Sequence, residues 1–169
     1  MTYKEIFLET PNKKKGAVII PTGILLHDTE WFNLQGCIDI FQDPASFASA
    51  HLLIDLDGTR YIFGKDNEKL YHAGHSIFNG RKWCNNFMLG VEFLGDTRKK
   101  PLTDDQIKSF VEEWAKPRIE KYNFINAVIT DHKKVRTDYI NQFGDNGGKI
   151  KAKRDIEQPE FDRIMKILF

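Results

Sequence analysis

Short apolar runs of strand length alternate along this chain with longer segments of helical periodicity. Segments with apolar residues three and four positions apart, as on one face of a helix, are 34–41, 103–119 and 159–169. The runs short enough to be strands are 16–20, 23–26, 50–54, 59–63, 88–94 and 127–130. Interleaved strands and helices indicate an α/β protein, and we expect a central mixed β-sheet flanked by helices.

Local turn and capping signals define several of these elements. The Asp57-Gly58 dipeptide between two apolar runs predicts a β-hairpin over 50–63. Thr103 and Gln106 form a capping box that begins the long helix, and Pro117 is expected to kink this helix or end it early. The polar, glycine-containing stretch 133–152 is expected to be a loop.

The composition is that of a globular protein with a single domain, 1–169. The 169 residues include 41% apolar and 29% charged side chains, which suffice for a core without covalent cross-links. The formal net charge of +1 provides no general attraction to nucleic acid or membranes. Cys37 and Cys84 form no CxxC motif, so we expect two free thiols.

The charged segment 1–16 has the character of neither a signal peptide nor a membrane span. We therefore expect a cytoplasmic protein, and we expect it to be a monomer.

Two histidines occupy equivalent places in the pattern. His27 ends the apolar run ILL, and His132 follows the run AVIT with only Asp131 between. Residues just past the carboxyl ends of buried strands lie at the rim of the sheet, where open α/β sheets bind ligands. Two imidazoles there could share a metal ion. The alternative is that each is an ordinary histidine at a strand end, since no short motif such as HExxH joins them.

Three charged residues are further candidates. Glu92 interrupts the apolar run LGVEFLG, where an unpaired charge is unexpected in a buried strand. It is either a general base in a cleft or a side chain on an exposed face. Lys153 and Asp155 are two positions apart, so an extended backbone would place both on one side. The alternative for this pair is a solvated run of charges.

Five stretches, in this order along the chain, resemble motifs of one enzyme family. They are GILLHDT (23–29), SAHLLIDLDGTRYIF (49–63), YHAGHSIFNGRKWCNNFMLGVEFLG (71–95), VITDH (128–132) and KRDIEQPEFDRI (153–164). Together they resemble the zinc-dependent N-acetylmuramoyl-L-alanine amidases, which include AmpD-like amidases, phage lysins and peptidoglycan-recognition proteins. The resemblance implies the mixed-sheet fold of that family.

The resemblance also implies roles for five residues. His27, His132 and Asp155 correspond to the family's zinc ligands, Glu92 to its catalytic carboxylate and Lys153 to its partner lysine. Three protein ligands leave one tetrahedral position open for water, as catalytic zinc sites require. Glu92 would move the proton of that water to the leaving amine, and Lys153 would stabilise the oxyanion. The implied reaction hydrolyses the amide bond between N-acetylmuramic acid and L-alanine in peptidoglycan or its muropeptide fragments.

The chain departs from the family pattern at several positions. Asp28 stands where the family often has a second histidine, and Ile156 stands where it has proline. The stretch after His132 is longer than usual and contains Asp138, in an RTD sequence of the same basic-x-Asp form as KRD. Asp155 is the preferred third ligand, because the Phe-Asp start of the last helix follows it as in the family. Asp138 is the alternative.

Other polar residues of the matched stretches receive supporting roles. The resemblance implies that His51 is structural or supports a metal ligand. We expect His72 to line the cleft or to support it through a hydrogen bond to a ligand. Asn85 and Asn86 lie where the family contacts substrate or fixes the loop. His75 is expected to be an exposed loop residue.

Several functions remain open on this basis. Hydrolysis could serve cytoplasmic recycling of wall fragments, or the chain could be a phage-type lysin that acts on the cell wall. A different class is a recognition domain that binds peptidoglycan without cutting it. The complete set of His27, His132, Asp155, Glu92 and Lys153 makes the enzyme the preferred prediction. The basic stretch 133–152 either is a solvated loop or contacts acidic groups of the substrate.

Overall fold

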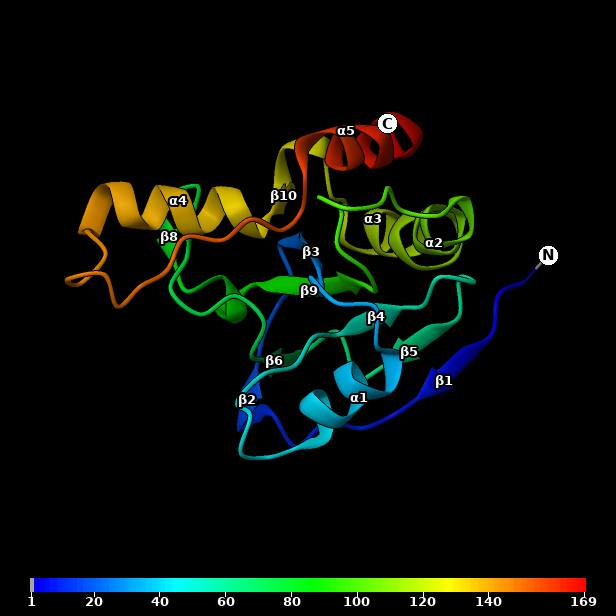
Figure 1. Ribbon diagram of the computed structural model, residues 1–169, viewed down its shortest axis with the longest axis horizontal. Helices are drawn as coiled ribbons and strands as arrows, with labels where there is room; N and C mark the ends of the chain where they lie inside the picture. Colours follow the sequence, from blue (N-terminus) through cyan, green and yellow to red (C-terminus); the bar gives the residue numbers. More distant parts are fainter. Residues whose placement is uncertain (1) are drawn as a thin grey trace.

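The computed structural model describes residues 2–169, which are arranged around a six-stranded sheet (Figure 1). Every neighbouring pair of strands is parallel except β4 and β5, which form the predicted hairpin. The predicted mixed sheet is confirmed. Across the sheet the strands follow the order β1 (Glu5–Phe7), β5 (Arg60–Ile62), β4 (Leu52–Ile54), β9 (Met88–Phe93), β3 (Gly23–Asp28) and β10 (Ile129–Asp131).

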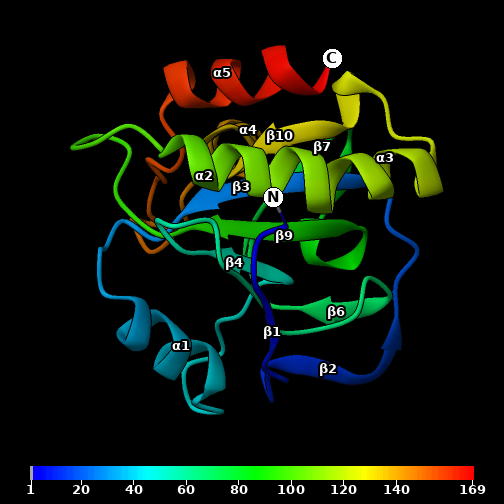
Figure 2. The same ribbon diagram turned by 90° about the vertical axis from the view of Figure 1, so that its right-hand side faces the viewer.

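One face of the sheet is covered by a long helix and by the C-terminal helix (Figure 2). The long helix consists of α2 (Asp104–Lys108), a π-helical segment (Ser109–Ala115) and α3 (Lys116–Tyr122), and the C-terminal helix is α5 (Gln158–Leu168). They share one buried apolar cluster with the strand residues of this face, which include Ile24, Leu26, Leu52, Ile54, Leu89, Val91 and Phe93.

The opposite face is covered by α1 (Leu34–Gln42) and α4 (His132–Phe143). Leu25 of β3 belongs to a buried cluster with Val135 of α4, and Leu53 of β4 belongs to another with Cys37 of α1. Side chains alternate between faces along a strand, so His27 points to the same face as Leu25. This face therefore carries the candidate site. The two cysteines are free and buried, as predicted.

The strand predicted over 16–20 is wrong in position and in burial. Strand β2 spans Lys13–Val18 and pairs with β6 (Glu68–Leu70) in a separate two-stranded sheet. Val18 is 74% exposed and Ile20 is 79% exposed. Apolar composition alone does not require burial, because much of a folded protein's surface is apolar. A third small sheet pairs β7 (Ile77–Phe78) with β8 (Arg81–Lys82).

The loop predicted over 133–152 is wrong in its first part, which α4 occupies, and confirmed from residue 144 onward. The carboxylate of Asp131 caps this helix by accepting a hydrogen bond from the backbone N–H of Lys134 at 2.8 Å. After His132, the buried residues of α4 are Val135, Arg136 and Tyr139. A helix with so narrow an apolar stripe shows little hydrophobic periodicity, which is why the sequence pattern did not reveal it. Residues 144–157 form no helix or strand.

Pro117 does not end the long helix. The backbone N–H of Lys116 bonds to the carbonyl of Val111, five residues earlier, which closes a π-helical turn just before Pro117. Pro117, which has no N–H, follows this turn directly as the second residue of α3. The helix continues to Tyr122.

The predicted capping box is present, and its loss should be measurable. The hydroxyl of Thr103 accepts from the N–H of Gln106 at 3.0 Å, and the Gln106 side chain accepts from the N–H of Thr103 at 3.0 Å. Thr103→Ala should lower the free energy of unfolding by about 1 kcal/mol, as measured by urea denaturation. Thr137→Ala, at an exposed position inside α4, is the matched control and should leave stability equal or slightly higher. Equal stability of Thr103→Ala and the wild type would contradict the prediction.

Candidate metal centre and active site

Three neighbouring parallel strands bring the candidate residues into one row across the sheet. His27 of β3 is in register with Glu92 of β9, and Leu26 is in register with Asp131, the last residue of β10. His132 follows Asp131 as the first residue of α4. The row therefore runs from His132 through His27 to Glu92, on the face covered by α1 and α4.

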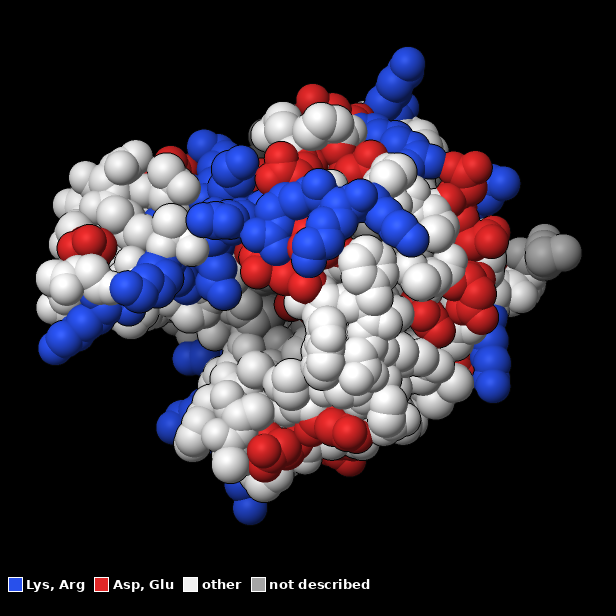
Figure 3. All heavy atoms as spheres, in the orientation of Figure 1, with Lys and Arg blue, Asp and Glu red and all other residues white. Residues whose placement is uncertain are grey.

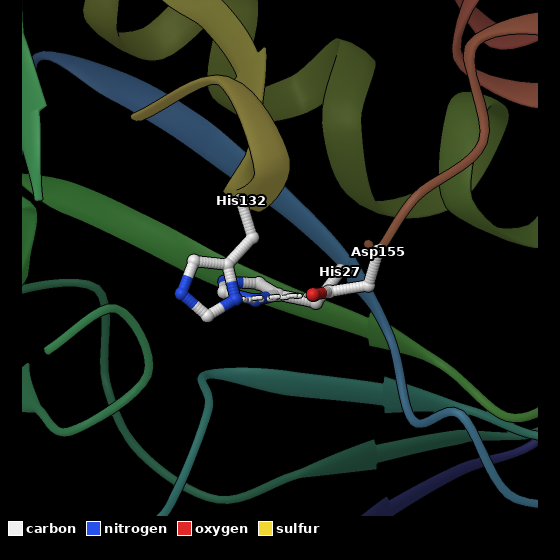
Figure 4. Close-up of side chains that lie close together, drawn as sticks. All are labelled: His27, His132 and Asp155. Carbon is white, nitrogen blue, oxygen red and sulfur yellow. Dashed lines mark hydrogen bonds and ion pairs between the residues drawn. The ribbon is translucent and has the colours of Figure 1, made fainter. Parts of the chain in front are cut away.

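Three of the predicted residues converge to within hydrogen-bonding distance. The Nδ1 atoms of His27 and His132 are 3.0 Å apart, and Oδ2 of Asp155 lies 3.1 Å from Nδ1 of His132 and 3.3 Å from Nδ1 of His27. All three side chains are buried. Figure 4 shows them pointing toward one another from β3, from the start of α4 and from the segment before α5.

This arrangement fits a tetrahedral zinc ion. With zinc–ligand bonds of about 2.0–2.1 Å, two ligand atoms at the tetrahedral angle are about 3.3–3.4 Å apart. The observed separations of 3.0, 3.1 and 3.3 Å are close to this value. Two imidazole nitrogens and a carboxylate oxygen are also a donor set typical of catalytic zinc sites, which keep a fourth position open. The residues present can therefore hold a metal ion.

The alternative third ligand, Asp138, lies elsewhere. Its carboxylate pairs with Lys134 one turn away on α4, at 3.1 Å, and its side chain is 38% exposed. The side chain of Asp155 is 5% exposed. Within residues 2–169, the group of side chains able to share a metal ion consists of His27, His132 and Asp155.

A hydrogen-bond chain from β3 holds the segment that carries Asp155. Oδ2 of Asp28 accepts from the N–H of Thr97 at 3.0 Å and also from its hydroxyl. The same hydroxyl oxygen accepts from the N–H of Glu157 at 3.0 Å. The carbonyl of Asp155 accepts from the N–H of Lys133 in the first turn of α4, at 2.9 Å. Asp28 thus supports the position of Asp155, although it contacts neither imidazole through a hydrogen bond within the described residues.

Burial and mutual contacts set the protonation of these groups. Burial, together with the neighbouring His132, lowers the pKa of His27 to about 4. At neutral pH, His27 is a neutral imidazole and Asp155 is a carboxylate. These are the forms that bind metal ions.

Glu92 combines burial with an oxygen that has no partner. Burial, reinforced by the charge of Asp155, raises the pKa of Glu92 well above its ordinary value. Its Oε1 lies 3.9 Å from Nδ1 of His27, and its Oε2 has no hydrogen-bond partner among residues 2–169. A partly buried carboxylate at a cavity wall with a raised pKa accepts protons more readily than an ordinary glutamate.

Two adjoining cavities open above this row of residues. One of about 400 Å³ is lined by the candidate ligands, by Glu92 and by residues of α1. The other, of about 380 Å³, extends toward Arg136 of α4 and Phe47. Figure 3 shows the molecule hollowed on this side, between α4 and α1. Residues that line both cavities are Tyr71, His72, His132 and Lys153.

Arg136 belongs to the framework of the site, although the sequence patterns assign it no role. Its guanidinium is buried and donates to the carbonyls of His75 at 2.6 Å, Lys151 at 2.8 Å and Ala73 at 3.1 Å. It thereby joins the loop after β6 and the segment before Asp155 to α4. Arg136 is one turn after His132, so recognition of α4 as a helix would have pointed to it.

The remaining histidines behave as predicted. Nδ1 of His51 accepts from the N–H of Gly90 at 3.0 Å, and its Nε2 donates to the carbonyl of Glu68 at 3.0 Å. His51 is therefore a satisfied structural residue. His75 is exposed.

Comparison with known proteins agrees with this geometry. The sequence profile of the N-acetylmuramoyl-L-alanine amidase family matches residues 17–146. The chain belongs to this family. The matched part of this chain includes His27, Glu92 and His132 and ends before Lys153 and Asp155. The predicted family is confirmed.

Individual relatives match parts of this chain. The 1,6-anhydro-N-acetylmuramyl-L-alanine amidase AmpD of Haemophilus influenzae is 31% identical over 113 residues, which are 67% of this chain and 53% of the relative. AmpD of Enterobacter cloacae is 34% identical over 134 residues, which are 72% of this chain and 71% of that protein. The chain thus spans about half of the first relative and more of the second.

The fold is shared with solved amidase-like structures. A mutant endolysin from Bacillus subtilis superposes with a TM-score of 0.69 at 17% identity, over 99% of this chain and 100% of that structure. A crystal structure of an AmpD derivative superposes with a TM-score of 0.68 at 20% identity, over 96% of this chain and 93% of that structure, so the predicted amidase fold is confirmed. Within residues 2–169, no helix has the length and apolar character needed to cross a membrane.

Proposed function

We propose that this chain is a zinc-dependent N-acetylmuramoyl-L-alanine amidase. It would hydrolyse the amide bond between N-acetylmuramic acid and L-alanine in soluble peptidoglycan fragments. The observation that carries this proposal is the convergence of His27, His132 and Asp155 beside Glu92, at a cavity in a member of the amidase family. The names of the AmpD relatives support 1,6-anhydro-muropeptides as the substrate class.

The proposed mechanism divides the work among five residues. His27, His132 and Asp155 would hold a zinc ion, which supplies Lewis-acid activation of water and of the scissile carbonyl. Glu92 accepts a proton from the attacking water at a carboxylate oxygen and donates it to the leaving amine of L-alanine. The ammonium group of Lys153, at the wall of both cavities, stabilises the negative charge that develops on the carbonyl oxygen.

Zinc removal and substrate choice test this function together. The purified protein should release the stem peptide from a 1,6-anhydro-muropeptide, as detected by chromatography with mass spectrometry. Release should stop after treatment with a zinc chelator and return when zinc is added, because the ligands remain folded around the site. A protein that binds no zinc, and stays inert when zinc is supplied, would instead favour a domain that only binds peptidoglycan.

Intact sacculi provide the second arm of the same assay. Preference for the soluble fragment over sacculi is expected for a recycling enzyme. Release of peptide from sacculi but not from the fragment would favour the phage-type lysin. The cytoplasmic location and the monomeric state stay predictions.

A further inference from the structure

The loop that follows β6 contacts both candidate histidine ligands on the side of their rings opposite to Asp155. Nδ1 of His72 lies 3.2 Å from Nε2 of His27, and the carbonyl of Ala73 lies 3.2 Å from Nε2 of His132. These contacts use the ring nitrogens that point away from Asp155. Two consecutive residues thus approach both imidazoles.

The hydrogen bonds of His72 determine which of its nitrogens carries a proton. Its Nε2 lies 3.1 Å from the carbonyl oxygen of Met88, which can only accept, so Nε2 is the N–H. In a neutral ring, Nδ1 is then an acceptor. It accepts from Nε2–H of His27, and Nδ1 of His27 is left as a lone pair that faces Asp155 and His132.

The opposite direction of the His72–His27 bond would need a charged His72. Both nitrogens of His72 would then donate, in a side chain that is 8% exposed. The ion pairs of imidazoles in residues 2–169 involve His27 and His132, and none involves His72. A buried imidazolium without a carboxylate partner is costly, so the neutral arrangement is the favoured one.

His132 is oriented in the same way by a backbone group. Its Nε2 donates to the carbonyl of Ala73, which leaves Nδ1 as a lone pair. Two lone pairs, 3.0 Å apart, and one carboxylate oxygen therefore converge. Three acceptors cannot satisfy one another by hydrogen bonding, whereas a cation satisfies all three.

The position of the loop is itself fixed by two contacts. Oδ1 of Asn85 accepts from the N–H groups of both His72, at 3.1 Å, and Ala73, at 2.8 Å. The His72 ring lies against the backbone of β9 at Gly90, where an added Cβ would be 2.3 Å from Cγ of His72. A glycine at this position is needed for the ring to reach His27. Asn85 thus fixes the loop that carries His72 and Ala73, and fixing a loop is one of the two roles expected for it.

We infer that the His72-Ala73 dipeptide sets the tautomers of both metal-binding histidines, with His72 as a positioning residue that accepts the Nε2 proton of His27. The inference rests on the proposed function only for the identity of the metal. When Nε2–H of a ligand histidine is bonded to a fixed acceptor, the tautomer and the orientation of the ring are already set. The lone pair of Nδ1 then points to the metal before the metal binds.

Substitutions at His72 test the inference through zinc affinity. His72→Leu removes the acceptor and should weaken zinc binding by about 10–100-fold, as measured by competition with a chelating indicator. His72→Asn places an amide oxygen near the position of Nδ1 and should recover most of that affinity. The absorption spectrum of the Co²⁺-loaded protein should change in His72→Leu and return toward the wild type in His72→Asn. His75→Leu, the same substitution at an exposed histidine of this loop, is the control and should match the wild type.

Wild-type zinc affinity and an unchanged cobalt spectrum in His72→Leu would overturn the inference. If the wild type still hydrolyses muropeptides, that result leaves the proposed function standing.

A measurement on the unmutated protein decides the question even if His72→Leu does not fold. Long-range ¹H–¹⁵N correlation spectra at neutral pH should show His27, His72 and His132 as Nε2–H tautomers. An Nδ1–H tautomer of His72 would refute the inference. If the tautomers are the predicted ones but the protein fails to bind zinc, the proposed function is refuted. The inferred orientation of the rings is then still supported.

Discussion

Replacing Asp155 with alanine is expected to weaken zinc binding by roughly a few hundredfold. Zinc sites with about four ligands have binding free energies of about 10–16 kcal/mol, so one ligand contributes about 2.5–4 kcal/mol. Each 1.4 kcal/mol corresponds to about a tenfold change in affinity. Asp155 also supplies the negative charge of the set, since His27 and His132 are neutral when they bind metal. Zinc affinity is measured by competition with a chelating indicator, and circular dichroism verifies that the variant is folded.

Asp138→Ala is the matched control for this experiment. Asp138 has the same side chain and the same basic-x-Asp surroundings in sequence, but it pairs with Lys134 on the exposed surface of α4. Its loss should leave zinc affinity unchanged and alter stability by at most about 0.5 kcal/mol. If Asp138→Ala lost zinc and Asp155→Ala retained it, the assignment of the third ligand would be wrong.

Replacing Glu92 with glutamine should lower kcat by about 10²–10⁴-fold while zinc affinity stays near that of the wild type. The amide has almost the size of the carboxylate but cannot accept the proton of the attacking water. Because Oε2 of Glu92 has no hydrogen-bond partner among the described residues, the substitution breaks no contact of that atom. Hydrolysis of a muropeptide and zinc affinity are measured on the same preparation.

Glu112→Gln provides the comparison for Glu92→Gln. Glu112 is exposed on the long helix, which covers the face of the sheet opposite to the candidate residues, and pairs with Lys116 at 2.7 Å. Its substitution should leave both kcat and zinc affinity unchanged. Full activity in Glu92→Gln would remove Glu92 as the base.

Local sequence patterns predicted the elements in which most side chains are buried. The strand that carries His27 and the strand that carries Glu92 are largely apolar runs because both faces of the sheet are covered. The capping box at Thr103 was predictable because both partners lie within one helical turn. Helix α4 was missed because few of its residues face the core, so that its polar composition reads as a loop.

The supporting contacts of the site could not be read from the chain. The bond between Asp28 and Thr97 joins residues 69 positions apart, and the bond between His27 and His72 joins residues 45 positions apart. No local periodicity encodes such pairs. Asp28 follows His27 directly, but its carboxylate accepts from Thr97, whose hydroxyl oxygen in turn accepts from the N–H of Glu157.

The sequence alone determined the α/β class, the amidase family and the five residues proposed to act, because these depend on apolar runs and on the order of motifs along the chain. The tertiary structure decided which aspartate stands beside His27 and His132, since Asp138 and Asp155 carry the same chemistry and differ only in where the backbone places them. It also decided which ring nitrogens face the site. That choice depends on acceptors at His72 and Ala73, which reach the imidazoles only after the sheet has formed.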